Sequence, residues 1–203
     1  MKKHDFETVY ASSFEITKEG ADAFANATFY TEEGLEGVKK IWLDRKITLT
    51  LDESVPAIGA PHAWGVGYDG SGVKIAIIDT GIWKDHPDLA GKVIAEGDFT
   101  DDGTPMDLYG HGTHCAGIAA ANGTVKGVAP GALLINAKAL NKNGQGYISW
   151  AMAAWEWAAE QGANVISMSF GTSPTDGTAP WDIALNTIVD NYNIVAVAAA
   201  GND

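Results

Sequence analysis

Short apolar runs alternate with polar, glycine-containing segments over residues 54–203. The run at residues 73–78 is nearly continuous, as is typical of a parallel strand that is covered on both faces. Further strand-like runs lie at residues 133–140, 164–169 and 194–200, and helix-like segments lie at residues 113–121, 149–161 and 182–191. This alternation predicts an α/β domain with a parallel sheet.

Residues 1–53 have a different pattern and carry no catalytic constellation. A mixed-charge helix is predicted at about residues 17–27, and a short strand at residues 38–43. The sequence therefore predicts a small α+β region at residues 1–53, with a boundary near residues 51–56, followed by the larger domain at residues 54–203.

Composition narrows the function classes. The chain has 203 residues, of which 46% are apolar and 19% charged, enough for one domain with a filled core. Its net charge of −13 and single arginine, Arg45, argue against binding to nucleic acid. No apolar run approaches the roughly 20 residues of a membrane helix, so no membrane partner is expected.

The amino terminus bears on the compartment, whereas the cysteine count leaves the redox compartment open. Lys2 and Lys3 are not followed by the apolar run of a signal peptide. Either the protein stays inside the cell, or the given start is internal to a longer precursor. The one cysteine, Cys115, excludes an internal disulfide and a cysteine-based zinc site, and it is expected to be a buried small apolar residue.

Asp79 directly follows the apolar run at residues 73–78. Ligands bind beyond the carboxyl ends of strands in sheets of this kind, so Asp79 is expected on that rim. A carboxylate in this position needs a hydrogen-bonding partner when it loses water. From this local pattern alone, a helix N-cap or an ordinary turn aspartate remains an equal alternative.

The segment Gly-His-Gly-Thr-His at residues 110–114 supplies a partner. Flanking glycines let the backbone turn sharply into a helix, which would place His111 at the rim of the sheet. A histidine that faces an aspartate is a general base with its orienting group. Metal binding by His111 and His114 is the alternative, but the glutamate of His-Glu-x-x-His and a third histidine are missing, so His114 is interpreted as a helix-packing residue.

Three segments together resemble the subtilisin-like serine peptidases, the subtilases. They are Ile-Ile-Asp-Thr-Gly at residues 77–81 with His-Pro-Asp-Leu at residues 86–89, the histidine segment at residues 110–114, and Ala-Ala-Gly-Asn at residues 199–202. The resemblance runs from about Ser54 to the last residue. It implies a three-layer, parallel-sheet subtilisin-like domain that is incomplete here, and a serine endopeptidase activity.

The resemblance also implies roles for individual residues. Asp79 and His111 correspond to the triad aspartate and histidine, and Asn202 to the side-chain donor of the oxyanion hole. Two segments correspond to those that flank a bound peptide: Gly144, Gln145 and Gly146, and Ser169, Phe170 and Gly171. Such edges bind peptides by strand addition. Without the motifs, both segments would be interpreted as ordinary glycine loops.

The nucleophilic serine of the family is missing from the sequence. No Gly-Thr-Ser-x-Ala-like segment occurs, and the family order would place the serine after Asn202. The chain is therefore interpreted as a fragment that is inactive alone. The alternatives are an inactive pseudopeptidase or peptide-binding module, and an unrelated nucleotide-binding α/β domain, whose glycine clusters would precede a strand rather than follow one.

Further expectations rest on the same resemblance. Residues 1–53 resemble part of a propeptide, with cleavage between about Leu49 and Ser54 and the tail at residues 48–51 lying in the substrate cleft. A structural amino-terminal extension is the alternative. A secreted monomer is expected, with peptide substrates and its own propeptide as partners.

Calcium is the expected cofactor. By resemblance, Asp88 corresponds to a calcium-holding carboxylate in many subtilases, although the loop at residues 121–126 is shorter than the usual calcium loop. A second group precedes the histidine segment and offers several oxygen ligands, as calcium requires: Asp98, Asp101, Asp102 and Asp107. A solvated acidic loop is the alternative for this group.

Overall fold

A computed structural model describes residues 2–6, 11–14, 46–49, 58–173 and 175–201. The predictions for residues 17–27, 38–43 and 51–56, and the proposed role of Asn202, fall outside these residues. Within the described residues, none of the helices is long and apolar enough to cross a membrane.

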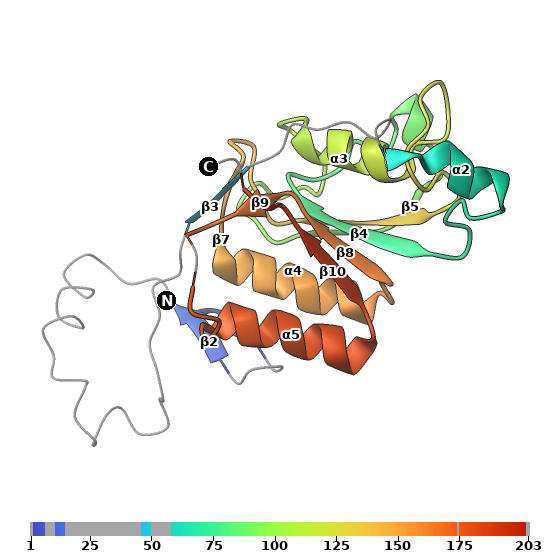
Figure 1. Cartoon of the computed structure of the whole chain (residues 1–203). Helices are drawn as coiled ribbons and strands as arrows, with labels where there is room; N and C mark the ends of the chain where they lie inside the picture. Colours follow the sequence, from blue (N-terminus) through green and yellow to red (C-terminus); the bar gives the residue numbers. More distant parts are fainter. Residues whose placement is uncertain (1, 7–10, 15–45, 50–57, 174, 202–203) are drawn as a thin grey trace, which may run out of the picture.

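The centre of the structure is a parallel sheet of five strands, in the order β10-β8-β4-β6-β5 (Figure 1). The strands are β4 (Lys74–Asp79), β5 (Val93–Asp98), β6 (Leu133–Lys138), β8 (Val165–Met168) and β10 (Val195–Ala198). Register pairs Asp79 with Lys138, Ile78 with Met168, and Met168 with Ala198. The carboxyl ends of these strands therefore form one rim.

Helices cover both faces of this sheet (Figure 1). They are α2 (Ala60–Gly65) and α3 (His111–Ala120) on one side, and α4 (Ile148–Glu160) and α5 (Pro180–Tyr192) on the other. Alternate residues of β4 serve the two cores: Ile77 packs with Cys115 and Ala116 of α3, whereas Ile78 packs in the cluster that includes Trp155 of α4. The predicted α/β class with a parallel sheet is confirmed.

Strand β5 and the short helix α2 escaped the sequence-based prediction. β5 forms an edge of the sheet and contains Glu96 and Gly97, so it lacks the continuous apolar run of a central strand. The predicted helix at residues 113–121 begins two residues earlier, at His111, because Gly110 at the N-cap adopts a left-handed conformation with φ of 103°.

Two smaller sheets complete the architecture. β1 (Lys2–Phe6) and β2 (Ala11–Phe14) form an antiparallel pair. In the other sheet, β3 (Lys46–Leu49) lies between β7 (Gln145–Tyr147) and β9 (Phe170–Gly171) and pairs antiparallel with both. A strand from the amino-terminal region therefore lies between two segments of the larger domain.

Candidate active site

The buried carboxylate of Asp79 ends the central strand β4. Asp79 is 1% exposed, and its Oδ1 accepts a hydrogen bond from the backbone N–H of Thr80 at 2.7 Å. Because β4 has neighbours on both sides, its carboxyl end is held in the middle of the rim. Burial of a carboxylate is costly without hydrogen-bond donors, so further partners are expected around it.

His111, the first residue of α3, provides the principal partner. Its Nδ1 lies 2.8 Å from Oδ1 and 3.0 Å from Oδ2 of Asp79. An ionised carboxylate can only accept hydrogen bonds, so Nδ1 carries a proton and donates the hydrogen bond to Asp79. The side chain of His111 is 13% exposed. The two residues singled out by the sequence motifs therefore form a hydrogen-bonded pair at the rim.

Close backbone contact brings α3 to the end of β4. A Cβ atom on Gly112 would lie 2.1 Å from the carbonyl oxygen of Gly81, which is closer than atoms can approach. Gly81 has φ of 103°, and a Cβ there would lie 2.4 Å from the carbonyl oxygen of Pro105. Glycine is needed at both positions because side chains would separate His111 from Asp79.

Proton affinity at His111 reflects this environment. The hydrogen bond to Asp79 is the main cause that raises the pKa of His111 from 6.5 to about 10, and Cys115 contributes in the same direction. Burial of the ring acts in the opposite direction. Asp79 therefore stabilises the imidazolium that forms when His111 takes up a proton, whereas His111 can act as a base only in its neutral form.

Cys115 lies directly beneath the imidazole. Its Sγ is 3.7 Å from Nδ1 and 3.9 Å from Nε2 of His111, and the residue is buried at 8% exposure. Among the described residues, Asp79, His111 and Cys115 are the one group of three potential metal ligands whose ligand atoms lie within 4.8 Å of one another. The hydrogen bond between Asp79 and His111, together with the place of Cys115 one turn after His111 in α3, accounts for this closeness.

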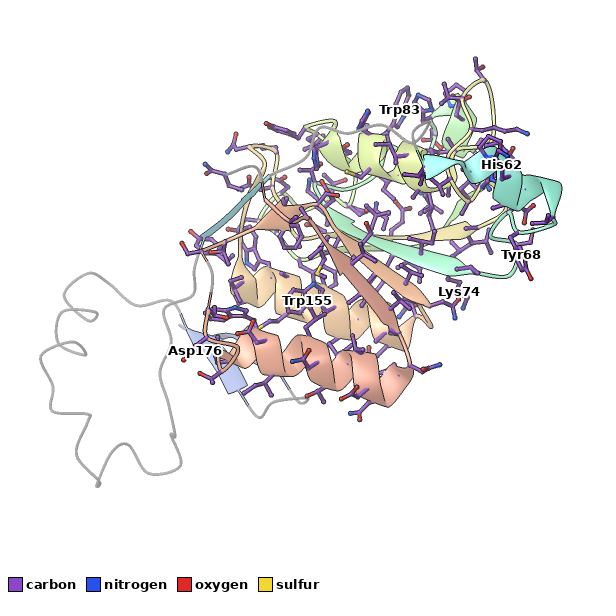
Figure 2. All side chains as sticks on the ribbon, in the orientation of Figure 1. His62, Tyr68, Lys74, Trp83, Trp155 and Asp176 are labelled. Atoms are coloured by element: carbon purple, nitrogen blue, oxygen red, sulfur yellow. The ribbon has the colours of Figure 1, made fainter. Side chains whose placement is uncertain are left out.

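His114 does not join this group. It is exposed and lines a pocket with Trp64 and His86, so its predicted role in helix packing is wrong. Trp83 also lies beside α3 (Figure 2), where its backbone N–H donates to Thr113 Oγ1 at 2.9 Å. The two histidines of the segment at residues 110–114 therefore face different surroundings, and only His111 reaches Asp79.

The two segments expected to flank a peptide do lie on either side of one extended strand. Thr48 of β3 pairs with Gln145 on one side and with Gly171 on the other. Gly144, Gly146, Ser169 and Phe170 are buried, whereas Gln145 and Gly171 are partly exposed. The backbone edges of β7 and β9 are thus placed to pair with an extended chain from both sides.

Most carboxylates of the expected calcium sites have internal partners. Asp88 accepts from the backbone N–H groups of Thr124 and Val125 at 2.7 and 3.2 Å. Asp98 accepts from the N–H groups of Thr100 and Thr104.

The rest of the acidic loop is divided between the surface and the interior. Asp102 lies 3.3 Å from the buried ammonium of Lys138 and accepts from the N–H of Lys142 at 2.7 Å, whereas Asp101 is exposed. Sequence reasoning missed Lys138, which is fully buried and donates to the carbonyl oxygen of Thr80 at 2.6 Å. Asp107, which the sequence suggested only as a calcium ligand, is buried and accepts hydrogen bonds from the N–H groups of Gly110 and Thr113.

Comparison with known proteins decides the family. A family model described as the subtilase family matches residues 70–203, which is more than half of the chain. This chain belongs to the subtilase family. The resemblance inferred from the three motifs is thereby confirmed, and the matched region of this subtilase holds Asp79, His111 and both segments that flank β3.

The relatives of this subtilase include proteases whose names describe them as extracellular or as intracellular. Thermitase of Thermoactinomyces vulgaris is 48% identical over 150 residues, which cover 71% of this chain and 52% of thermitase. The minor extracellular protease Vpr of Bacillus subtilis is 37% identical over 194 residues, covering 88% and 23% of the two chains. The major intracellular serine protease of the same organism is 38% identical over 162 residues, covering 75% and 50%. The chain thus spans about half or less of the length of these relatives.

Proposed function

We propose that this chain carries the acid–base half of a serine endopeptidase, with Asp79 and His111 as two members of a catalytic triad. The observation that carries the proposal is the hydrogen bonding of His111 Nδ1 to both carboxylate oxygens of Asp79, at 2.8 and 3.0 Å. The position of the Asp79–His111 pair on the rim of the sheet supports the same function, as do the serine proteases among the relatives.

The chemistry follows from the two ring nitrogens. Nδ1–H is bonded to Asp79, so Nε2 is the atom that takes the proton of a serine hydroxyl as its oxygen attacks the carbonyl carbon of the peptide. The resulting imidazolium then gives that proton to the leaving amine, and water releases the acyl group by the same steps in reverse order. Asn202 is proposed to donate to the oxyanion, a kind of contact whose loss costs on the order of 10²–10³ in kcat.

The nucleophile is proposed to come from residues beyond Asp203. Ser167 lies in β8, Ser169 follows this strand, and Ser173 lies in the exposed loop after β9. Ser149 lies in α4, on the opposite face of the sheet from α3. Of these four serines only Ser149 stands at the start of a helix, and that helix covers the face of the sheet opposite to α3, so we expect the 203-residue chain to be inactive alone.

The test uses the gene product whose reading frame continues past Asp203 to a Gly-Thr-Ser segment. We expect it to hydrolyse peptide anilides and to be labelled by a fluorophosphonate at that serine. Replacement D79N or H111A should lower kcat by several orders of magnitude. Because the pKa of His111 is raised, kcat/KM should increase with pH through the alkaline range. Labelling of residues 1–203 alone, or full activity of H111A, would contradict the proposal.

Residues 1–53 are proposed to act as the inhibitor of the same enzyme. The antiparallel pairing of β3 with both β7 and β9 supports this role, because it occupies the two edges that a peptide substrate would use. A peptide of residues 44–51 should compete with substrate for the enzyme that lacks residues 1–53, and a scrambled peptide should not. If neither peptide competes, the inhibitor role is wrong, and residues 1–53 are a structural amino-terminal extension.

Peptide binding without hydrolysis is the second candidate function, which the same arrangement of β7 and β9 favours. Whether the reading frame continues past Asp203 to a serine segment distinguishes the two functions. If translation stops at Asp203 in the native source, a labelled peptide should bind to the chain without residues 1–53 and be recovered uncut.

Calcium, secretion and the monomeric state remain proposals. Because a ligand that binds only the folded chain stabilises it, we expect millimolar calcium to raise the melting temperature relative to EGTA if Asp98, Asp101 and Asp102 bind the ion. Recovery of the native product from culture medium would support secretion, which the extracellular name of Vpr favours and the intracellular relative does not. Light scattering of the purified product should report one chain per particle.

A further inference from the structure

Asp107 is a buried carboxylate in the loop between β5 and α3, with 8% of its surface exposed. It accepts five hydrogen bonds. Oδ1 accepts from Thr80 Oγ1 at 2.9 Å, Tyr109 N at 2.9 Å and Gly110 N at 2.7 Å, and Oδ2 accepts from Thr113 N at 2.8 Å and Thr113 Oγ1 at 2.6 Å. So many donors on one carboxylate hold several separate backbone segments together.

The backbone donors lie on both sides of His111. Gly110 precedes it and Thr113 follows two residues later, so the Asp107 carboxylate is hydrogen-bonded to the backbone of the first turn of α3. The first N–H groups of a helix have no partner within the helix, and the N-cap residue, Gly110, has no side chain to supply one. Asp107 takes over this task, and its negative charge suits the positive end of the helix dipole.

Thr80 connects the same carboxylate to Asp79. Thr80 directly follows Asp79, donates from Oγ1 to Asp107, and accepts at Oγ1 from the N–H of Gly112 at 2.9 Å. Its own N–H donates to Asp79 Oδ1. The neighbours of Asp79 and of His111 in the chain are therefore joined through one hydroxyl and one carboxylate.

We propose that Asp107 is a positioning residue, which acts with Thr80 to fix the distance between Asp79 and His111. The hydrogen bonds of Asp107 go to the start of α3 and to Thr80 rather than to the imidazole, so it acts through these groups. The inference deepens the proposed function by adding a residue that prepares the pair. A displacement of even a fraction of an ångström at the start of α3 would lengthen the bonds from Nδ1 and weaken the hold of Asp79 on the imidazolium.

The charge state of Asp107 fits this role. Burial alone would raise its pKa, but the hydrogen bonds from Thr113, Gly110 and Tyr109 prevail and lower it below the ordinary value of 3.8. Asp107 therefore stays ionised and can accept at both oxygens through the neutral and alkaline range. Other titratable residues around this network include Tyr109, Asp79, His111, Cys115, and the buried pair of Lys138 with Asp102.

The test measures the pKa of His111 in the 203-residue chain by NMR titration of the imidazole, which needs no nucleophile. In D107N an amide NH2 group replaces one carboxylate oxygen, and this group cannot accept hydrogen bonds from the donors around it. We expect this replacement to lower the pKa of His111 by about one pH unit. The matched control is D182N, which alters a carboxylate that accepts from the N–H of Ala179 at the start of α5. D182N should leave the pKa of His111 unchanged.

A second pair of variants keeps the proposal testable if D107N does not fold. T80V removes the bridging hydroxyl but leaves the bonds of Asp107 to α3, whereas T80S retains the hydroxyl. T80V should lower the pKa of His111, and T80S should keep it at the wild-type value. If D107N and T80V lose stability but titrate like the wild type, the role of Asp107 is only structural and the proposal is wrong. Because the readout is a titration, it stands apart from whether the longer product hydrolyses peptides.

Discussion

Replacement of Asp79 by asparagine should change how the stability of the chain depends on pH. In the folded chain the pKa of His111 is raised from 6.5 to about 10, mainly by Asp79. At about 1.4 kcal/mol per pH unit, protonated His111 therefore adds roughly 5 kcal/mol to the free energy of unfolding, compared with neutral His111. A raised pKa stabilises the folded state fully below pH 6.5, and this contribution disappears as the pH rises through about 10. Asparagine carries no charge, so most of this dependence should vanish in D79N.

The assay is urea unfolding followed by tryptophan fluorescence, at half-unit steps from pH 5.5 to pH 11. The difference in unfolding free energy between the wild type and D79N isolates the pair, because tyrosine, lysine and cysteine titrate in both proteins. We expect this difference to be largest near pH 6 and to shrink by several kcal/mol toward pH 11. D182N should run parallel to the wild type. A difference between the wild type and D79N that does not vary with pH would refute the reasoning.

Three more replacements test the packing and charges around the pair. G112A should destabilise the chain by about 3 kcal/mol, because its Cβ would meet the carbonyl oxygen of Gly81 at 2.1 Å, whereas G117A on the same helix, with nothing within 4 Å, should not destabilise it in urea unfolding. K138M should cost about 3 kcal/mol in the same assay by leaving the Asp102 carboxylate without its cation, whereas K84M, which removes one partner of a solvent-exposed pair, should cost far less. C115A should lower the pKa of His111 in NMR titrations, but by less than D79N does, since Asp79 is the larger cause.

The sequence by itself determined four strands of the parallel sheet, the helices α3, α4 and α5, and the positions of Asp79 and His111. This was possible because these features depend on local patterns. An apolar run that ends in a carboxylate marks the end of a buried strand, and glycines around His111 mark a sharp entry into a helix. The family motifs added the two segments on either side of β3.

Tertiary structure alone decided which distant groups meet. Edge strand β5 lacks an apolar run, and the burial of Lys138 depends on the turn after β4 and on the loop that holds Asp102. Asp107 is one of several acidic residues in the sequence, and only the folded chain brings Thr80, Gly110 and Thr113 to its two oxygens. Local sequence records the conformation of each segment, whereas the partner of a buried polar group is set by sheet register and helix packing across many residues of chain.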